Sequence, residues 1–179
     1  IIKQLKDIKT ICNLGCGTMG FGTAIAFAQN GYNVNMYGRK EASIERATKN
    51  INFTLNVMIE NNLLTEAGAK EVLSRIHGVT TLKDAAHNAD FVIESVAEEL
   101  SIKQSVYKEM EEYLGEDVIF ATDSSGLSPT AVAAALKHPE RFVVAHFWNP
   151  PHLIPLVEVV PGEKTSQEVV DITWSLMTT

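Results

Sequence analysis

The feature that most constrains this chain is a glycine-rich loop near its start. Residues 8–14 (IKTICNL) form a short, β-branched apolar run, which predicts a buried strand, and the loop GCGTMG at residues 15–20 follows directly. Residues 18–30 are rich in alanine with helical apolar spacing, which predicts a helix that stops at Gly31. A second alternating strand at residues 32–37 completes a unit of about 30 residues.

This G-x-G-x-x-G spacing between a strand and a helix predicts a site for the pyrophosphate of a dinucleotide. Gly15 permits the tight turn, Gly17 lets the pyrophosphate approach the backbone, and Gly20 lets the helix pack closely on the strand. Thr18 and Met19 begin the helix, where unpaired N–H groups bind anions. The alternative is a glycine turn without a ligand.

Strand-like and helix-like segments alternate along the rest of the chain. Because such strands are joined by crossover helices, we expect an α/β fold with a doubly wound, mostly parallel sheet and helices on both faces. No linker or repeat divides residues 1–179, which we expect to form one dinucleotide-binding domain. The further expected strands are residues 77–80, 90–96, 118–122, 142–146 and 156–160, and the further helices are residues 41–62, 66–75, 102–114, 129–137 and from about 166.

Composition narrows the classes of function. A net charge of −7 argues against a general nucleic-acid binder, which needs Lys and Arg to neutralise phosphates. No apolar run reaches the roughly 18 residues of a membrane span. Cys12 and Cys16 form neither a CxxC pair nor a disulfide framework, so a cytoplasmic location is expected. The histidines and cysteines lack the spacing of metal ligands, so no metal site is expected.

The end of the second strand departs from the usual pattern of NAD sites. Such sites place Asp or Glu about 20 residues beyond the loop to bind the adenosine ribose. Here Gly38 is followed by Arg39 and Lys40. Because a guanidinium can pair with a 2′-phosphate, we expect NAD or NADP as the cofactor, with NADP favoured through Arg39. The alternative is a solvated Arg39 and NAD bound without its usual anchor.

Polar residues follow three later strands, at the edge of the sheet where doubly wound folds bind ligands. His146 is the only histidine among them, and its near-neutral pKa range suits proton abstraction. Glu158 interrupts an apolar run, LVEVV, so we expect it to pair with His146, although a purely structural histidine stays open. The polar residues are Glu94, Glu98 and Glu99 after the first strand, Asp123, Ser124 and Ser125 after the second, and His146 and Asn149 after the third.

Four stretches in order resemble the N-terminal, NAD(P)-binding domain of the L-3-hydroxyacyl-CoA dehydrogenase family. They are LGCGTMGFGTAIAFAQNGYNV, ADFVIESVAEELSIKQSVYKEM, FATDSSGLSPTAVA and ERFVVAHFWNPPHLIPLVEVVPG. The last one is also similar to the branch that contains λ-crystallin (L-gulonate 3-dehydrogenase) and carnitine dehydrogenases. The resemblance implies a Rossmann-type fold. It also implies hydride transfer between a nicotinamide dinucleotide and the 3-hydroxyl carbon of an L-3-hydroxyacyl-CoA, such as 3-hydroxybutyryl-CoA.

The resemblance also implies roles for particular residues. The family's His–Glu pair matches His146, which would take the hydroxyl proton, and Glu158, which would orient the imidazole. Ser125 matches a serine that bonds the reacting oxygen. The family residues that flank the nicotinamide half, the CoA entrance and the cofactor match Glu98, Lys103 and Asn149. Further CoA contacts are expected from Arg46 and Lys49 on the long helix.

Three departures from the family pattern accompany these matches. Gly38 replaces the ribose-binding Asp, and Asp123 replaces an Asn, placing a negative charge near the nicotinamide unless it is paired or protonated. The family's helical C-terminal domain, which completes the substrate pocket and the homodimer interface, has no counterpart in residues 1–179, so the fragment is expected to be inactive alone. The alternatives are a dehydrogenase of a free 3-hydroxy acid, such as L-gulonate or carnitine, and a nucleotide-binding module without turnover.

Overall fold

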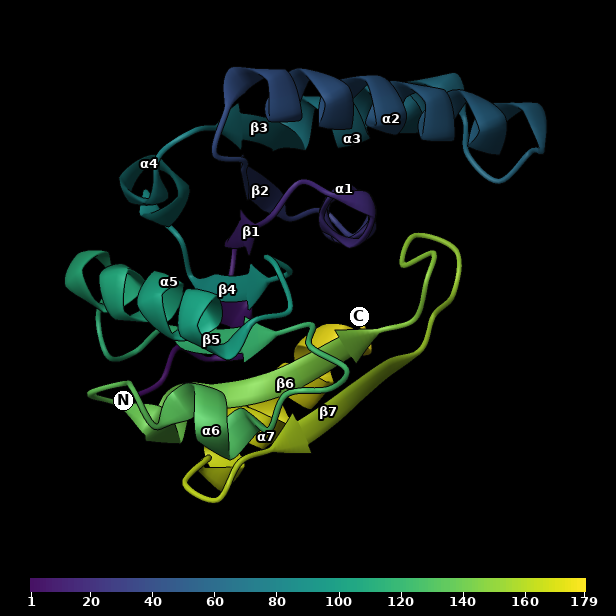
Figure 1. Ribbon diagram of the computed structural model, residues 1–179. Helices are drawn as coiled ribbons and strands as arrows, with labels where there is room; N and C mark the ends of the chain where they lie inside the picture. Colours follow the sequence, from purple (N-terminus) through teal and green to yellow (C-terminus); the bar gives the residue numbers. More distant parts are fainter.

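Seven strands form one sheet in the order β3-β2-β1-β4-β5-β6-β7 (Figure 1). The computed structural model describes residues 1–179. The strands from β1 to β6 pair in parallel, and β7 is antiparallel to β6, so the expected doubly wound, mostly parallel sheet is confirmed. The strands are β1 (Thr10–Leu14), β2 (Asn33–Tyr37), β3 (Ile76–Val79), β4 (Phe91–Glu94), β5 (Ile119–Thr122), β6 (Phe142–Phe147) and β7 (Val157–Pro161).

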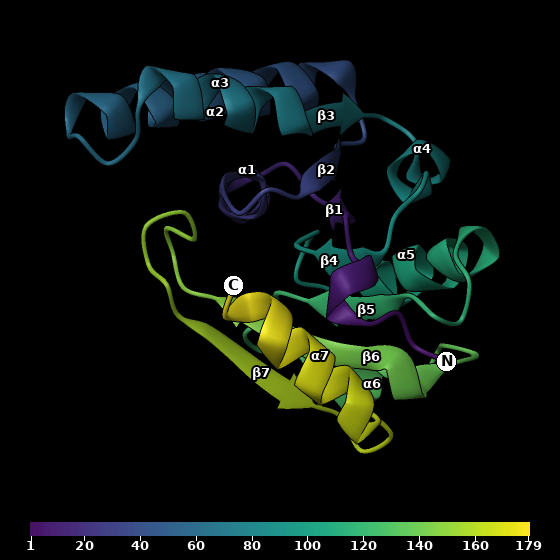
Figure 2. The same ribbon diagram turned by 180° about the vertical axis from the view of Figure 1, so that it is seen from behind.

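Helices cover both faces of this sheet (Figures 1 and 2). Helices α1, α2, α3 and α7 build a core of 24 buried residues on one face, and α4, α5 and α6 build a core of 15 on the other. Strands β4 and β5 are therefore buried at every position. The helices are α1 (Thr18–Gln29), α2 (Glu41–Glu60), α3 (Glu66–Arg75), α4 (Leu82–Ala86), α5 (Leu100–Tyr113), α6 (Pro129–Ala133) and α7 (Gln167–Met177), with 3-10 turns at Leu5–Asp7 and Pro139–Arg141.

The differences from the sequence-based prediction concern short elements. Helix α4 was not predicted, because its five residues are too few to show a helical period. Its start is nevertheless marked by Thr81, whose side chain accepts a hydrogen bond from the backbone N–H of Asp84. Helix α6 ends at Ala133, four residues before the predicted end. None of these differences removes a predicted strand from the sheet.

Strand β7 runs antiparallel because of its connection to β6. A loop of residues 148–156 joins the two strands, and this segment is too short for the helical crossover that a parallel neighbour needs. Strand β7 therefore lies at the edge of the sheet, where its residues are half-buried or exposed. This position decides how far Glu158 is exposed to water.

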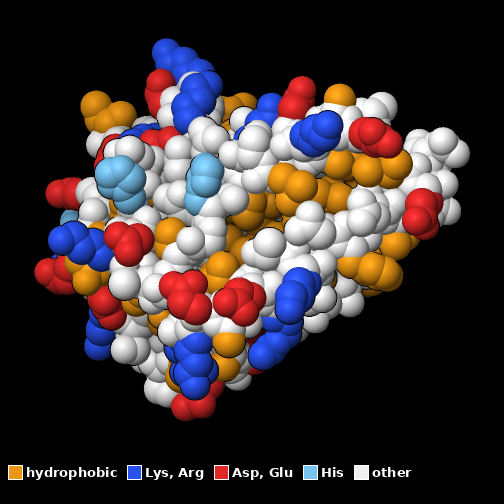
Figure 3. Space-filling view, turned by 90° about the horizontal axis from the view of Figure 1, so that it is seen from above, with side chains coloured by type: hydrophobic (Ala, Val, Ile, Leu, Met, Phe, Trp, Pro, Cys, Tyr) orange, Lys and Arg blue, Asp and Glu red, His pale blue; other side chains and the backbone are white.

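The face over α2 and α3 carries exposed hydrophobic side chains, edged by charged ones (Figure 3). Phe53 is 71% exposed and Leu63 is 60% exposed. Together with Val57 and with Leu153 of the loop after β6, they line a hollow of about 150 Å³. No helix of the chain is both long enough and apolar enough to cross a membrane.

Candidate active site

The glycine-rich loop is held closed by a buried amide. Asn13 at the end of β1 donates hydrogen bonds from Nδ2 to the carbonyl oxygens of Gly15 (3.0 Å) and Gly20 (2.9 Å). Thr23 of α1 donates to Asn13 Oδ1 at 2.9 Å, which fixes the amide's orientation. Gly15 has a φ of +128°, a backbone conformation that other residues rarely adopt. The predicted tight turn is therefore present, and the hydrogen bonds of Asn13 hold it in place.

The loop fits a bound pyrophosphate. No side chain caps the N-terminus of α1, and its first turn holds no acidic residue that would repel an anion. A Cβ added at Gly17 would meet nothing within 4 Å, so the space before the helix is open to a ligand. A Cβ added at Gly20 would collide with the carbonyl of Gly15, so only glycine allows this close approach.

Gly38 is buried, and its surroundings explain why it carries no side chain. A Cβ at this position would lie 2.5 Å from Sγ of Cys16 and 3.0 Å from Cδ1 of Ile44. Cys16 thus fills the place where a ribose-binding carboxylate would begin. Burial raises the pKa of the Cys16 thiol, and the nearby positive charge of Arg46 opposes this rise. Arg39, the next residue along the chain, is exposed beside this place.

His146 and Glu158 form the predicted contact. They stand directly opposite each other on β6 and β7, and Nδ1 of His146 lies 2.7 Å from Oε2 of Glu158. The same Oε2 accepts a hydrogen bond of 3.3 Å from Nε1 of Trp148. The hydrogen bond from His146, and then that from Trp148, hold the pKa of Glu158 below its usual range. Glu158 therefore stays ionised and fixes the imidazole.

This geometry leaves one ring nitrogen of His146 free to exchange a proton. An ionised carboxylate only accepts hydrogen bonds, so Nδ1 carries the hydrogen and Nε2 keeps its lone pair. The His146 side chain is 25% exposed and that of Glu158 is 53% exposed, so solvent reaches the pair. The arrangement is therefore suited to general acid–base chemistry.

A pocket of about 440 Å³ connects the glycine-rich loop with His146. Met19 lines its end at the N-terminus of α1, and His146 lines the end near β6. The predicted residues Ser125 and Asn149 also face this pocket, so the structure brings them together with His146. The remaining lining residues are Ser95, Val96, Glu98, Lys103, Asp123, Phe147 and Trp148.

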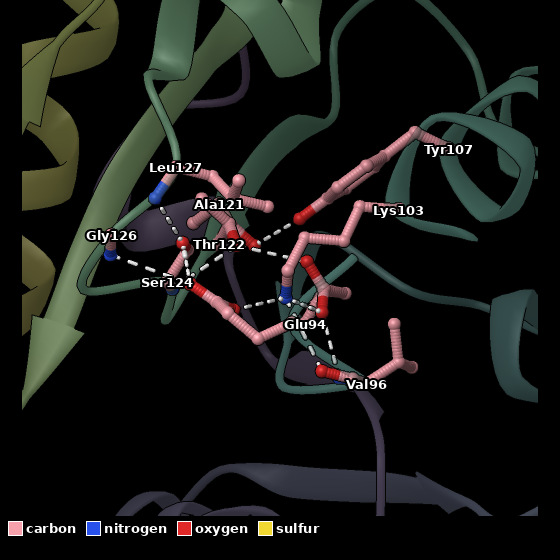
Figure 4. Close-up of polar contacts among 10 residues, drawn as sticks. Glu94, Val96, Lys103, Tyr107, Ala121, Thr122, Ser124, Gly126 and Leu127 are labelled. Atoms are coloured by element: carbon pink, nitrogen blue, oxygen red, sulfur yellow. Dashed lines mark hydrogen bonds and ion pairs between the residues drawn. The ribbon is translucent and has the colours of Figure 1, made fainter. Parts of the chain in front are cut away.

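A buried ion pair supports one wall of the pocket (Figure 4). Nζ of Lys103, which is 1% exposed, lies 2.6 Å from Oε1 of fully buried Glu94 and 3.2 Å from Oε2 of Glu98. The other oxygen of Glu98 accepts hydrogen bonds from Oγ of Ser124 and from the backbone N–H of Gly126. The cluster ties the loop after β4 to the loop after β5.

The buried cluster shows where two of the predicted site residues lie. Lys103 lines the pocket, and its ammonium is engaged by two carboxylates and hidden from solvent, so its expected contact with a ligand stays a prediction. The carboxylate of Glu98 is used within the protein as well. These two residues therefore shape the pocket, whereas Ser125 is exposed within it.

Asp123 lies at the end of β5 and is 9% exposed. Its Oδ1 accepts a hydrogen bond of 2.7 Å from the backbone N–H of Phe147. Burial is the main cause that raises the pKa of Asp123 to about 6, although the bond from Phe147 and the charge of His146 act against it. The sequence analysis expected Asp123 to be either paired or protonated. The structure gives it a hydrogen-bond partner, and its raised pKa makes protonation easier.

Two contributing residues were missed from the sequence. Asn13 is an amide inside an apolar strand directly before the glycine-rich loop, and that unusual placement was a usable signal. Trp148 lies two residues after His146, but nothing in the sequence shows that its indole reaches Glu158, since that contact depends on the pairing of β6 with β7.

Comparison with known proteins assigns the chain to a family. The family model described as "3-hydroxyacyl-CoA dehydrogenase, NAD binding domain" matches residues 10–179. The chain belongs to this family. Its site combines a loop that fits a pyrophosphate with a His–Glu pair whose histidine lines the same pocket as Met19 of that loop.

Similar proteins include longer chains. The fatty acid oxidation complex subunit alpha of Pseudomonas syringae pv. syringae is 39% identical over 96% of this chain and 24% of its own length. The 5-formyl-3-hydroxy-2-methylpyridine 4-carboxylate 5-dehydrogenase of Mesorhizobium japonicum is 38% identical over 91% of this chain and 52% of its own length. The chain thus spans between about a quarter and about half of these relatives.

Solved structures agree in fold. The 3-hydroxybutyryl-CoA dehydrogenase from Escherichia coli K12 matches 95% of this chain and 36% of its own, with a TM-score of 0.91 and 35% identity. The (S)-3-hydroxybutyryl-CoA dehydrogenase from Ralstonia eutropha matches 95% of this chain and 60% of its own, with a TM-score of 0.91 and 34% identity.

Proposed function

We propose that this chain is the cofactor-binding part of an oxidoreductase that interconverts an L-3-hydroxyacyl-CoA and the 3-ketoacyl-CoA. The observation that carries the proposal is the contact of His146 with Glu158, together with a pocket that both His146 and Met19 of the glycine-rich loop line. When bound, the nicotinamide would accept a hydride from the carbon that bears the 3-hydroxyl. The proton of that hydroxyl then has to leave as the carbonyl forms.

His146 is placed to take this proton on Nε2, while Glu158 holds Nδ1 and balances the charge of the imidazolium. The partly exposed imidazole can afterwards release the proton to water. Ser125 faces the same pocket and can donate its O–H to the reacting oxygen. His146 is thus the general base in oxidation and the general acid in reduction.

The acyl-CoA substrate is supported by relatives and by side chains on α2 and on the loop between β6 and β7. Two similar structures are 3-hydroxybutyryl-CoA dehydrogenases. The hollow that Phe53 and Leu153 line offers apolar surface, and Arg46 and Lys49 of α2 are exposed for an anionic substrate. A substrate without CoA, such as a free 3-hydroxy acid, is the second candidate, because a relative named for a pyridine carboxylate is about equally similar.

The test is an assay of the full-length protein with acetoacetyl-CoA and either NADH or NADPH, followed by the loss of reduced-nicotinamide absorbance. Turnover supports the acyl-CoA proposal. Turnover with a free 3-hydroxy acid such as L-gulonate or carnitine, and none with acetoacetyl-CoA, favours the second candidate. Dinucleotide binding without turnover of any of these substrates favours a binding module.

We also propose a preference for NADP over NAD. Cys16 fills the space of a ribose-binding carboxylate, and the exposed guanidinium of Arg39 stands next to it. Charge-assisted hydrogen bonds to a 2′-phosphate contribute about 1.5–3 kcal/mol each. The description of the family names NAD as the bound cofactor. The proposed preference for NADP therefore rests on residues 16, 38 and 39 of this chain and not on the family.

Dissociation constants for NADH and NADPH at one salt concentration test this preference. Arg39→Ala should weaken NADPH binding about tenfold or more and leave NADH binding nearly unchanged. The double variant Cys16→Ala with Gly38→Asp removes the contact with Sγ and should reverse the preference, whereas Gly38→Asp alone must displace Cys16. Tighter binding of NADH by the unmodified protein would contradict the proposal.

A homodimer of the full-length protein and its cytoplasmic location stay predictions. Light scattering of the full-length protein tests the first, and fractionation of the cells that make it tests the second.

A further inference from the structure

Asp123 is fixed by the strands on both sides of it. Its backbone N–H donates a hydrogen bond of 2.8 Å to the carbonyl of Glu94 at the end of β4. On the other side, its Oδ1 accepts the hydrogen bond from the backbone N–H of Phe147 at the end of β6. The carboxyl group therefore cannot swing away from the pocket that it lines between the glycine-rich loop and His146.

The carboxylate has no cationic partner of its own. Among the charged neighbours, His146 on β6 most favours its ionised form, and the imidazole is already paired with Glu158 of β7. Lys103 on α5 is engaged by Glu94 of β4 and by Glu98 of the loop after β4. Asp123 thus brings a buried, uncompensated negative charge to the pocket.

The pocket is where a nicotinamide would lie, because it begins at the pyrophosphate-binding loop and ends at the proton-transfer pair. The oxidised nicotinamide ring carries a positive charge, and the reduced ring is neutral. In a site of low dielectric, a fixed carboxylate favours the charged ring over the neutral one. An uncharged amide at the same position would make no such distinction.

We propose that Asp123 makes the dinucleotide site selective for the oxidised cofactor. The inference rests on the proposed function, since it requires a nicotinamide dinucleotide in this pocket. It applies equally to NAD and to NADP, because the adenosine half would bind elsewhere, beside Gly38. The consequence is a site that holds the oxidised cofactor firmly and releases the reduced product readily.

The selectivity should depend on pH with a definite sign. The pKa of Asp123 is raised to about 6, so the carboxylate is mostly ionised above this pH and mostly protonated below it. Preference for the oxidised cofactor is therefore present above pH 6 and lost below it. Because other charged groups also surround the pocket, the pH dependence has to be compared with a variant that lacks only the Asp123 charge.

The variant for this test is Asp123→Asn in the full-length protein. Asn keeps an oxygen that can accept the hydrogen bond from Phe147 and removes only the ionisable group. Asp171→Asn is the matched control, because it makes the same chemical change on the exposed surface of α7. Calorimetry gives Kd for the oxidised cofactor, the reduced cofactor and ADP-ribose, which lacks the nicotinamide.

The ratio of the two cofactor affinities should shift about tenfold toward the reduced form in Asp123→Asn above pH 6. ADP-ribose binding and the control variant should be unchanged. Retention of the unmodified ratio by a variant that still binds ADP-ribose would overturn the inference and leave the proposed function standing. If the unmodified protein binds none of the three ligands, the proposed function itself fails. If the variant does not fold, a ratio in the unmodified protein that stays constant across pH 6 also overturns the inference.

Discussion

Two contacts between a basic and an acidic side chain, one near the end of β4 and one near the end of β6, have almost the same separation but different surroundings. His146 and Glu158 lie 2.7 Å apart on the β6–β7 edge, where both are reached by water. Lys103 and Glu94 lie 2.6 Å apart behind the loops after β4 and β5, where neither is more than 1% exposed. The distances alone would suggest similar roles for the two pairs, but the pairs differ in how far they are buried.

The surroundings decide what each pair can do. An exposed pair contributes little to stability, because water solvates either charge alone, and for the same reason it can gain and lose protons during a reaction. In a buried pair, each charge depends on the other, and losing one leaves the other without compensation. The edge pair is therefore suited to chemistry, and the buried pair is suited to holding the wall of the pocket.

The largest effect is expected on turnover, from the edge pair. His146→Ala in the full-length protein should lower kcat by about 10²–10⁴-fold, because the proposed general base is removed. The unfolding free energy should change by less than about 1 kcal/mol, because the pair is exposed. Steady-state kinetics and urea unfolding measure the two quantities.

His138→Ala is the control for this variant, since His138 is paired with Glu140 at 3.1 Å on the surface away from the pocket. Its kcat should match that of the unmodified enzyme. Full activity of His146→Ala would show that another group moves the proton.

A large effect on stability is expected from the buried pair. Lys103→Met should lower the unfolding free energy by about 3–5 kcal/mol, because Glu94 is left as an uncompensated buried charge. Burial already raises the pKa of Glu94, and without Lys103 the carboxyl will escape the penalty by taking up a proton at low pH. The loss should therefore be larger at high pH than at low pH, as urea unfolding across pH would show.

The double variant Glu94→Gln with Lys103→Met should recover most of the lost stability, because neither charge remains. If Lys103→Met lowers the unfolding free energy by no more than about 1 kcal/mol, as expected for an exposed pair, the difference in burial between the two pairs does not affect stability.

A small effect is expected from Trp148, which shares the carboxylate of the edge pair. Trp148→Phe keeps an aromatic ring and loses the N–H that bonds Oε2 of Glu158. The pKa of Glu158 should rise toward its ordinary value, so the acid limb of the kcat profile should move to higher pH. The loss in kcat should be about threefold, as for one weak hydrogen bond.

Trp174→Phe on α7 is the control, since Trp174 is 61% exposed. A loss as large as that of His146→Ala would mean that Trp148 contacts the substrate and does not merely position Glu158.

The sequence predicted the elements that have strong local signals. The glycine-rich loop, the long helix α2 and the strands of the sheet were identified because glycine spacing and apolar periodicity are local properties. Helix α4 was missed because five residues show no period. His146 and Glu158 were paired correctly from their residue types and the family resemblance, and β6 and β7 bring them together.

The sequence by itself determined the order of strands and helices, the glycine-rich loop and the identity of the polar residues after each strand. Only the tertiary structure decided which of those side chains are exposed to water. Lys103 on α5 and His146 in β6 are both basic side chains that pair with a carboxylate, yet Lys103 is 1% exposed and His146 is 25% exposed. Exposure depends on what packs over a residue from distant parts of the chain, and it sets the cost of changing a charge.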